Sequence, residues 1–406
     1  MNEPSSSTPT GSDPAEEAPR LGRTGTSRPP RSGRFLAGRS VAGRSLAAAL
    51  LLAPLLATGV ACNQPPGEQV SGTAAAETRE ADPADFVQRL AKYSDFAAAE
   101  GRTVVAGNEG WLFFLPELQS LAAGPFWGPT DAQGQPRSQS DDPLPAILDF
   151  RDQLEAAGAQ LLLVPVPAKA SLYPDRLFDD VTVGVPGDLA PYGGAHQAFL
   201  DELAARGVHV LDLYPLFAAR RFDGGGRLYC RTDTHWSGRA CQLTAEAIVR
   251  RAVDEGWIGA EEPSPYRSET KPVEIRGDLW RDLPEPRPPV ETLELALVGS
   301  GPDLAPVEVD RSSPVLVLGD SHALVFHAGG DLHSQQAGLS DQLALGFGFP
   351  IDLIGVRGSG ADAARINLLR RGTGAAGKKL VVWVFSARTF TERGVWKTIP
   401  LLPPEG

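Results

Sequence analysis

Apolar runs of strand length alternate with helix-like stretches through most of this chain. The short apolar runs predict strands buried on both faces, at residues 160–166, 208–213, 315–318, 351–356 and 379–385. Apolar residues spaced three and four apart predict helices over residues 83–93, 146–157, 196–206, 237–255, 339–345 and 361–371. Buried strands interleaved with helices indicate a mostly parallel sheet covered on both faces, which is a three-layer α/β fold.

Composition divides the chain into three parts. Residues 1–62 join an apolar segment to a basic N-terminus rich in Ser, Gly, Pro and Arg, which is predicted to be disordered. Residues 63–81 are predicted to be a linker, and residues 82–406 the folded domain. Within that domain, residues 257–310 lack periodicity and are rich in Pro and Glu, so we expect an irregular excursion from the sheet edge.

The N-terminal part has the features of an export signal. Seven arginines and four acidic residues occupy the first fifty positions, and the apolar run 46–57 follows. That run is shorter than the roughly 20 apolar residues of a membrane span, so a cleaved signal is expected and an uncleaved anchor is the alternative. Cys62 resembles a lipoprotein attachment cysteine, or is an ordinary cysteine after a signal. We therefore predict a periplasmic or envelope location, with membrane association through this segment.

Net charge narrows the possible partners. The chain carries 50 acidic residues against 38 Lys and Arg, a formal charge of −12, and the basic N-terminus leaves the remainder still more acidic. A nucleic-acid binder normally presents a basic face. No nucleic-acid partner is expected.

Ser321 lies where a predicted buried strand ends, in the tripeptide Gly-Asp-Ser. Ligands bind at the carboxyl ends of strands in an open α/β sheet. A serine that opens a helix there can expose its Oγ and turn its own N–H toward an anion. Asp320 is expected to cap that helix or fix the turn. Taken alone, this tripeptide more often marks an ordinary capped turn than a catalytic serine.

Asp233 and His235 supply the groups that could activate a serine. Alternate residues of an extended segment point to the same side, so the imidazole can take the serine proton while the carboxylate holds its tautomer. Trp236 is expected to wall off the site and to contact the substrate, and the helix from Ser237 to anchor the segment. Together with Ser321, this pair predicts acyl transfer through a covalent serine ester.

Cys230 and Cys241 bracket the Asp-Thr-His segment. In an oxidising compartment they could form a disulfide that pins it, and two buried free thiols are the alternative. A zinc site that uses both and His235 has no apparent fourth ligand. No metal and no cofactor are predicted.

Several segments resemble, in order, the alginate O-acetyltransferase family of the AlgJ/AlgX type, which has an SGNH-hydrolase-like fold. They are residues 107–114, 164–174, 210–213, 231–236, 276–279, 319–321 and 381–383. The Asp/His segment precedes the serine, whereas ordinary SGNH hydrolases carry the serine first. The resemblance therefore implies a circularly permuted motif order over about residues 82–395.

The resemblance implies roles for the three residues. Ser321 would be the nucleophile and, through its N–H, part of the oxyanion hole. His235 would be the general base and Asp233 its orienting partner. Gly358 and Gly360 match the glycine after the next strand that helps to form the oxyanion hole, with a flexible turn as the alternative.

Other positions carry a weaker correspondence. Arg388 matches an arginine after the last strand, which would bind a substrate carboxylate or cap the strand end. His322, where relatives more often have an aromatic residue, is either a polar contact to substrate or only a helix N-terminal residue. Val384 replaces an acidic residue, and Lys169 and Tyr173 match a segment interpreted as a structural turn. No carbohydrate-binding module is expected after the final strand.

These inferences predict an exported O-acetyltransferase that acts on a cell-surface or secreted polysaccharide similar to alginate. The resemblance implies a membrane-bound O-acyltransferase as the partner that supplies acetyl groups. The same three residues with water as acceptor would make an acetylesterase or polysaccharide deacetylase. A non-catalytic subunit of polysaccharide assembly is the further alternative.

Overall fold

The computed structural model describes residues 79–80, 82–183, 193–259, 263–281, 283–358 and 360–403. They belong to one unit, Gly72–Gly406. The predicted signal, Cys62 and most of the predicted linker lie outside the described residues. Within the predicted linker, Arg79–Glu80 form a short strand, β1, that pairs with β5 (Val181–Thr182). Among the described residues, no helix combines the length and apolarity needed to cross a membrane.

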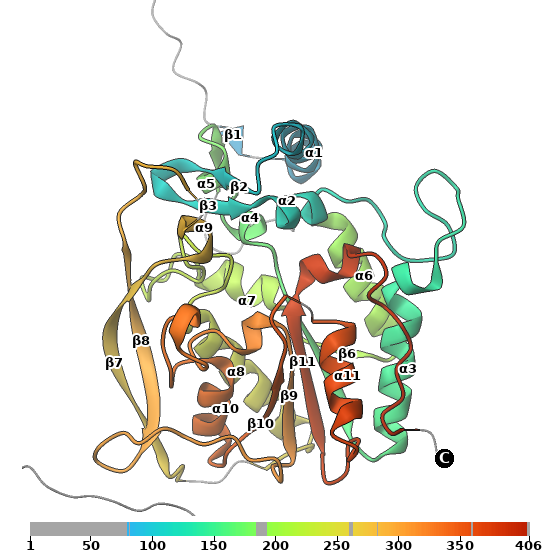
Figure 1. Ribbon diagram of the computed structural model, residues 1–406, viewed down its shortest axis with the longest axis vertical. Coiled ribbons are helices and arrows are strands. Elements are labelled where there is room, and N and C mark those ends of the chain that lie inside the picture. Colours follow the sequence, from blue (N-terminus) through green and yellow to red (C-terminus); the bar gives the residue numbers. More distant parts are fainter. Residues whose placement is uncertain are drawn as a thin grey trace, which may run out of the picture. The chain divides into compact units, whose positions relative to one another are not determined.

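A five-stranded parallel sheet forms the centre of the fold (Figure 1), and its strand order is β10-β9-β11-β4-β6. The strands are β4 (Gln160–Val166), β6 (His209–Val210), β9 (Val315–Gly319), β10 (Asp352–Gly355) and β11 (Leu380–Ser386). All five were predicted, which confirms the mostly parallel α/β fold. Strand β6 is shorter than predicted because Asp212 accepts a hydrogen bond from the Tyr214 N–H (2.9 Å) and so starts a helix.

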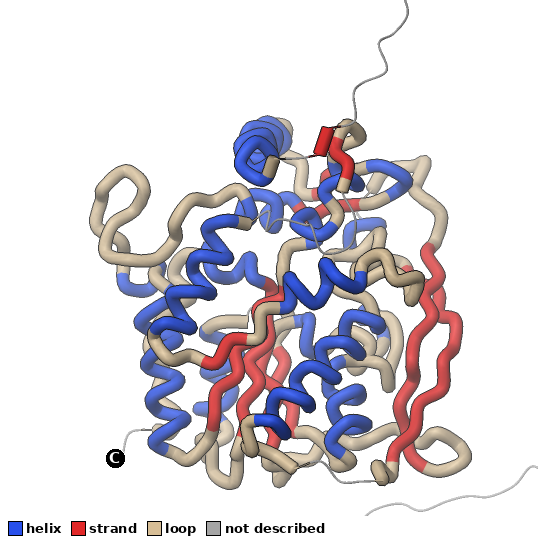
Figure 2. The backbone as a smooth tube through the Cα atoms, turned by 180° about the vertical axis from the view of Figure 1, so that it is seen from behind, coloured by secondary structure: helices blue, strands red, loops and turns tan. Residues whose placement is uncertain are grey.

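Helices cover both faces of the sheet (Figures 1 and 2). One face packs against α7 (Leu213–Arg220), α8 (Gly238–Asp254) and α10 (Leu339–Phe347). The other packs against α3 (Pro143–Ala156), α6 (Gly194–Ala205) and α11 (Asp362–Arg370). Successive residues of β4 alternate between these cores: Leu162 belongs to the first and Leu161 to the second. A strand buried on both faces must be apolar throughout, which is why its sequence is a continuous apolar run.

Short elements lie across the carboxyl ends of the strands (Figure 1). They are the hairpin of β2 (Val104–Ala106) and β3 (Leu112–Phe114), with η1 (Asn108–Gly110) at its turn, and the helices α2 (Leu115–Leu121), α4 (Lys169–Leu172) and α5 (Pro174–Leu177). Helix α1 (Pro83–Ala99) begins as predicted, with Asp82 accepting a hydrogen bond from the Ala84 N–H. The 3-10 helices η2 (Gln139–Asp141) and η5 (Ala387–Thr391) precede α3 and follow β11.

Residues 257–310 are not the irregular excursion that was expected. Strands β7 (Tyr266–Ile275) and β8 (Glu291–Ser300) pair antiparallel along their whole length, and between them lies the short helix α9 (Asp278–Arg281). In β8 the side chains of Glu291, Leu293 and Leu295 are buried, while Thr292 and Glu294 are exposed. The prolines and glutamates around this period-two pattern concealed it. The hairpin packs beside α8 and α10 and carries α9 to the carboxyl edge of the sheet.

Candidate active site

The loops that follow three parallel strands line a cavity of about 490 Å³. Ser321 follows β9, Gly358 follows β10, and Arg388 follows β11. His235 and Glu117 enter the same cavity from the segment before α8 and from α2. The cavity therefore occupies the edge of the sheet where ligands of α/β proteins bind.

Asp320 fixes the turn on which Ser321 stands. Its Oδ1 accepts a hydrogen bond from the His322 N–H, and its Oδ2 accepts one from the Ser386 N–H, both at 2.8 Å. The predicted helix after the serine is wrong, because only one 3-10 turn, η3 (Ser321–Ala323), follows. The left-handed backbone of Phe326 (φ 61°) prevents that turn from continuing. The serine is held by hydrogen bonds of Asp320 rather than by a long helix.

Ser321, His235 and Asp233 form one continuous line of hydrogen bonds. The Oγ of Ser321 lies 2.7 Å from His235 Nε2, and His235 Nδ1 lies 2.6 Å from Asp233 Oδ1. The imidazole and the carboxylate are buried, while Ser321 is partly exposed to the cavity. The structure thus brings together the three residues that the sequence singled out, in the geometry that lets an imidazole accept a hydroxyl proton.

Two further groups hold the second oxygen of Asp233. The Asp278 N–H donates to Oδ2 at 2.8 Å, and His333 Nε2 lies 3.0 Å from the same oxygen. Burial opposes ionisation of this carboxyl, but the adjacent His235 and His333 hold the Asp233 pKa well below its usual value. Asp233 is therefore a permanent negative charge beside the imidazole.

Asp233 also controls the titration of His235. Burial by itself disfavours the imidazolium, yet the charge and hydrogen bond of Asp233 raise the His235 pKa above its usual value. A histidine in this state accepts a proton readily, which is what a general base requires.

The β7–β8 hairpin holds the segment that carries the aspartate and histidine. Glu291 of β8 is buried, and its Oε2 accepts hydrogen bonds from the N–H groups of Arg231 (2.7 Å) and Thr232 (3.3 Å). Asp278 accepts one from the Thr234 N–H at 2.8 Å. Gly277 is required by close approach, because a Cβ there would lie 1.9 Å from the Thr232 carbonyl oxygen.

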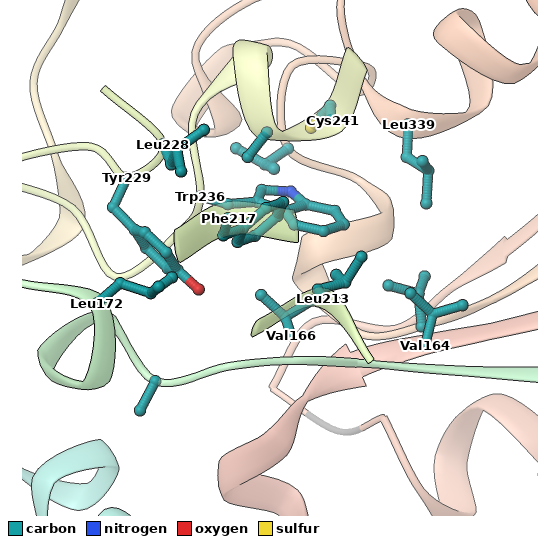
Figure 3. Close-up of a cluster of buried hydrophobic side chains, with 14 of the residues drawn as sticks. Val164, Val166, Leu172, Leu213, Phe217, Leu228, Tyr229, Trp236, Cys241 and Leu339 are labelled. Atoms are coloured by element: carbon teal, nitrogen blue, oxygen red, sulfur yellow. The ribbon is translucent and has the colours of Figure 1, made fainter. Parts of the chain in front are cut away.

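Trp236 does not wall off the cavity, so its predicted contact with substrate is wrong. Its side chain is fully buried and packs with Leu213, Phe217 and Leu228 in the core beneath α8 (Figure 3). The reason is the alternation of an extended segment: if His235 faces the serine, its neighbour must face the opposite way.

His322 and Arg388 both line the cavity. His322 is buried, its Nδ1 lies 3.1 Å from Asp320 Oδ1, and its ring lies 4.9 Å from that of His235. Burial lowers the His322 pKa, so this ring is neutral at pH 7. Arg388 donates to Glu392 from η5 at 2.5 Å and reaches the cavity over the ring of Phe114.

The two glycines predicted for the oxyanion hole differ. Gly358 has a left-handed backbone (φ 73°) and lines the cavity. Gly360 is buried, and its carbonyl accepts a hydrogen bond from Trp383 Nε1 at 2.8 Å. The geometry therefore favours Gly358 at the site and gives Gly360 a packing role.

Gly360→Ala is expected to destabilise the protein by about 3 kcal/mol, because the new Cβ would lie 2.3 Å from the Cβ of Phe385. Gly358→Ala is the matched control: its Cβ meets nothing within 4 Å, which leaves only about 1 kcal/mol of left-handed strain. Chemical unfolding of the two variants measures both values. Equal values would show that Gly360 is not confined by packing.

Cys230 and Cys241 are free thiols, which agrees with the alternative to a disulfide. The Cys230 thiol donates to the Trp236 carbonyl oxygen at 3.4 Å, and burial raises the pKa of both thiols well above the usual value. They are core residues in this structure. Asp233, His235 and Asp278 lie close enough to share a metal ion, but their donor atoms already hold the hydrogen bonds described above.

Sequence reasoning missed a buried lysine and a buried glutamate beside the cavity. Lys169 is fully buried and donates to the carbonyl oxygens of Leu112 (2.8 Å) and Asp233, so it supports the segment that carries the relay. The backbone N–H of Lys169 donates a hydrogen bond to Glu117 Oε2 at 3.2 Å. Burial raises the Glu117 pKa to about 7, although Lys169 and Arg388 oppose that shift. The structural turn predicted at Lys169 is thus also a support of the site.

Glu117 should make the free energy of unfolding fall as the pH rises. The unfolded chain releases this proton near pH 4.5 and the folded chain near 7, so the folded state binds more protons in between and loses stability as pH rises. Relative to the wild type, Glu117→Gln should gain up to about 3 kcal/mol in unfolding free energy between pH 5 and pH 8. Urea unfolding at both pH values measures this gain. The exposed Glu274→Gln is the control, and a gain of the same size there would refute the assignment to Glu117.

Fold and site together define the class of protein. The fold has three layers, with a parallel sheet between two layers of helices, and it carries a hydrogen-bonded serine, histidine and aspartate at the carboxyl edge of the sheet. These features define an SGNH-hydrolase-like domain. The chain belongs to the family described as "SGNH hydrolase-like domain, acetyltransferase AlgX", whose pattern matches residues 104–387. The family resemblance noted in the sequence is thereby confirmed.

Individual relatives agree with this assignment. The probable alginate O-acetylase AlgJ of Pseudomonas syringae pv. tomato is 33% identical over 194 residues, which cover 46% of this chain and 42% of that protein. The corresponding Pseudomonas aeruginosa protein is 31% identical over 163 residues, 40% of this chain and 34% of that protein. The chain thus spans less than half the length of these curated relatives.

Solved structures show the same fold. The O-acetyltransferase domain of Pseudomonas putida AlgJ superposes with a TM-score of 0.54 at 22% identity, covering 72% of this chain and 94% of that one. Pseudomonas aeruginosa AlgX gives a TM-score of 0.51 at 16% identity, covering 73% of this chain and 66% of that one.

Proposed function

We propose that this protein is an O-acetyltransferase that moves an acetyl group onto a hydroxyl of an exported polysaccharide of the alginate type. The observation that supports it most is the hydrogen-bonded line from Ser321 through His235 to Asp233 at the wall of an accessible cavity. The names of its relatives, alginate O-acetylases, indicate the acetyl group and the polymer.

The first half-reaction would acylate the serine. Ser321 Oγ attacks the carbonyl carbon of the donor ester while His235 Nε2 takes its proton. The negative oxygen of the tetrahedral intermediate would be stabilised by backbone N–H groups at Ser321 and Gly358. When the bond to the donor alcohol breaks, the imidazolium returns the proton to that alcohol. The acetyl group is then an ester of Ser321.

The second half-reaction repeats these steps with the polysaccharide. A sugar hydroxyl attacks the serine ester and gives its proton to His235. The ester bond to Ser321 breaks, and the imidazolium returns that proton to the serine oxygen. Asp233 remains ionised throughout and stabilises the imidazolium.

Product analysis tests this proposal. The protein is incubated with a small acetate ester and an oligosaccharide of uronic acids, and both products are measured. Acetyl groups on sugar hydroxyls are expected. Free acetate with no acetylated sugar would overturn transfer and identify an esterase, while no turnover of any acetyl donor would favour a non-catalytic subunit.

The proposal includes an envelope location. The arginine-rich start and the apolar run 46–57 support export and membrane association through residues 1–62. A membrane-bound O-acyltransferase would supply the acetyl groups there. Fractionation of cells that produce the tagged chain checks the location, and recovery in the cytosol would contradict it.

The pH profile should report the raised His235 pKa. The general base must be neutral, so kcat/KM is expected to fall about tenfold per pH unit below this pKa. Because Asp233 raises that pKa, the acid limb should lie above pH 6.5, the ordinary value of a histidine. A profile of small-ester turnover from pH 5 to 9 measures it. A limb below 6.5 would contradict the coupling of His235 to Asp233.

A further inference from the structure

A second cavity, of about 720 Å³, shares no lining residue with the catalytic one. The segment before α8 contributes to both: Arg231 and Ser237 line the second cavity, while Asp233 and His235 line the first. Five arginines line this second cavity, namely Arg176, Arg221, Arg227, Arg231 and Arg239. Such a concentration of cations stands out in a chain whose net charge is −12. The relay described above uses none of these side chains.

Three of the arginines are neutralised by nearby carboxylates. Arg176 pairs with Glu109 at 2.6 Å, Arg227 with Glu291 at 2.8 Å, and Arg239 with Asp223 at 2.5 Å. These pairs hold the walls in place.

The other two arginines retain donors that bond nothing. The Nε of Arg231 is buried without a hydrogen-bond partner, and its guanidinium has no carboxylate within ion-pair distance among the described residues. Arg221 is more than nine-tenths buried and pairs with Asp175, yet its Nε and Nη1 also lack partners. Buried donors normally find an acceptor, so these atoms point to a ligand that brings oxygen atoms.

Aromatic rings give this site a rigid and partly apolar wall. The Arg221 guanidinium lies 4.6 Å from the centre of the Tyr173 ring and 4.5 Å from that of Phe222. Phe222 remains 46% exposed beside the cavity. It is followed by a loop of three glycines, where Gly225 allows the Arg239 guanidinium to lie close: a Cβ would stand 2.5 Å from its Cζ.

This combination fits a sugar acid better than an inorganic anion. A guanidinium offers two parallel donors to a carboxylate, and an exposed ring can cover the C–H face of a pyranose. Two acidic residues, Glu109 and Glu294, also line the cavity and can accept hydrogen bonds from sugar hydroxyls. A phosphate ion would gain nothing from the ring, and it lacks the array of hydroxyls that the glutamates could bind.

We propose that the arginine-lined cavity binds a uronate unit of an acidic polysaccharide, with Arg231 and Arg221 on the carboxylate and Phe222 on the ring. The ligand class rests on the proposed function, because the bound unit would belong to the same polymer that accepts the acetyl group. A chain held in this cavity would have a high effective concentration at the catalytic one, without being consumed there.

Calorimetric titration of the full chain carrying Ser321→Ala tests the proposal without turnover. A 1,4-linked hexauronate is expected to bind at least ten times more tightly than the neutral hexaglucan of the same linkage, with an affinity that falls as salt rises. Arg231→Gln should weaken hexauronate binding about tenfold, and Phe222→Ala several-fold. Arg206→Gln, which removes an exposed arginine directly after α6, should leave the affinity for hexauronate unchanged. Thermal unfolding confirms that each variant is folded.

Three results would overturn the inference: equal binding of the neutral hexaglucan, unchanged affinity in the folded Arg231→Gln variant, or inorganic phosphate binding as tightly as hexauronate with the same dependence on Arg231. The last would identify a simple anion site. These outcomes are separate from the failure of the proposed function. A protein that binds hexauronate through Arg231 but transfers no acetyl group would keep the site and lose the transferase.

Discussion

Ser321→Ala is expected to lower kcat/KM for a chromogenic acetate ester by about 10⁴-fold or more. In the proposed mechanism the Ser321 hydroxyl carries the acyl group, and alanine removes both this nucleophile and the proton that the imidazole would accept. Ser321 is partly exposed and adds little to the core, so the variant should fold normally.

The exposed Ser312→Ala is the matched control for this change, because its hydroxyl bonds only Asp310 on the surface. It should retain full activity and the wild-type unfolding temperature. Turnover by a folded Ser321→Ala protein within tenfold of the wild type would reject the serine as nucleophile.

Asp233→Asn is expected to lower kcat/KM by about 10³- to 10⁴-fold with little change of structure. An amide cannot stabilise the imidazolium, and it can present an N–H to the imidazole, which would favour the wrong tautomer. The acid limb of the pH profile should also move to lower pH, since Asp233 is what raises the His235 pKa. The surface variant Asp180→Asn is the control.

In Asp233→Asn the loss of rate and the shift of the acid limb are expected to occur together. A large loss of rate with an unmoved acid limb would contradict the assigned coupling, because a general disruption of the site could lower the rate without changing that pKa. A full rate with a shifted limb would remove Asp233 from the mechanism.

The central sheet could be predicted because a strand covered on both faces must be apolar along its length. β4 and β11 are such runs, and the predicted bounds of β4 match the structure. The β7–β8 hairpin was missed because only one side of it is buried, and its alternation is interrupted by charged residues and prolines. The order of strands in the sheet depends on tertiary packing and left no trace in the sequence pattern.

The three hydrogen-bonded residues of the site could be predicted from the sequence, whereas the residues that hold them in place could not. Ser321, Asp233 and His235 lie in short local motifs, but His333 reaches Asp233 from a loop a hundred positions away, through a left-handed backbone. For Asp278 the sequence held one indication of a role at the site, because this residue lies in a segment that resembles the family. Glu117 lies on the short helix α2, whose sequence gives no sign of the site, and only burial beside Lys169 makes this residue unusual.

Trp236 shows how a correct premise can lead to a wrong contact. The same alternation that places Asp233 and His235 on one side of the segment places Trp236 on the other, in the core. Large aromatic residues beside a site should therefore be assigned by the parity of their position before a binding role is given to them.

The account depends most on an acyl group carried by one serine oxygen. The direct measurement is mass spectrometry of the intact and digested protein after brief incubation with an activated acetate ester. We predict the added mass of one acetyl group on the peptide that contains Ser321, absent in Ser321→Ala and discharged when an acceptor oligosaccharide is added. An unmodified Ser321 in a protein that still turns over the ester, or an adduct that persists in Ser321→Ala, would contradict the account.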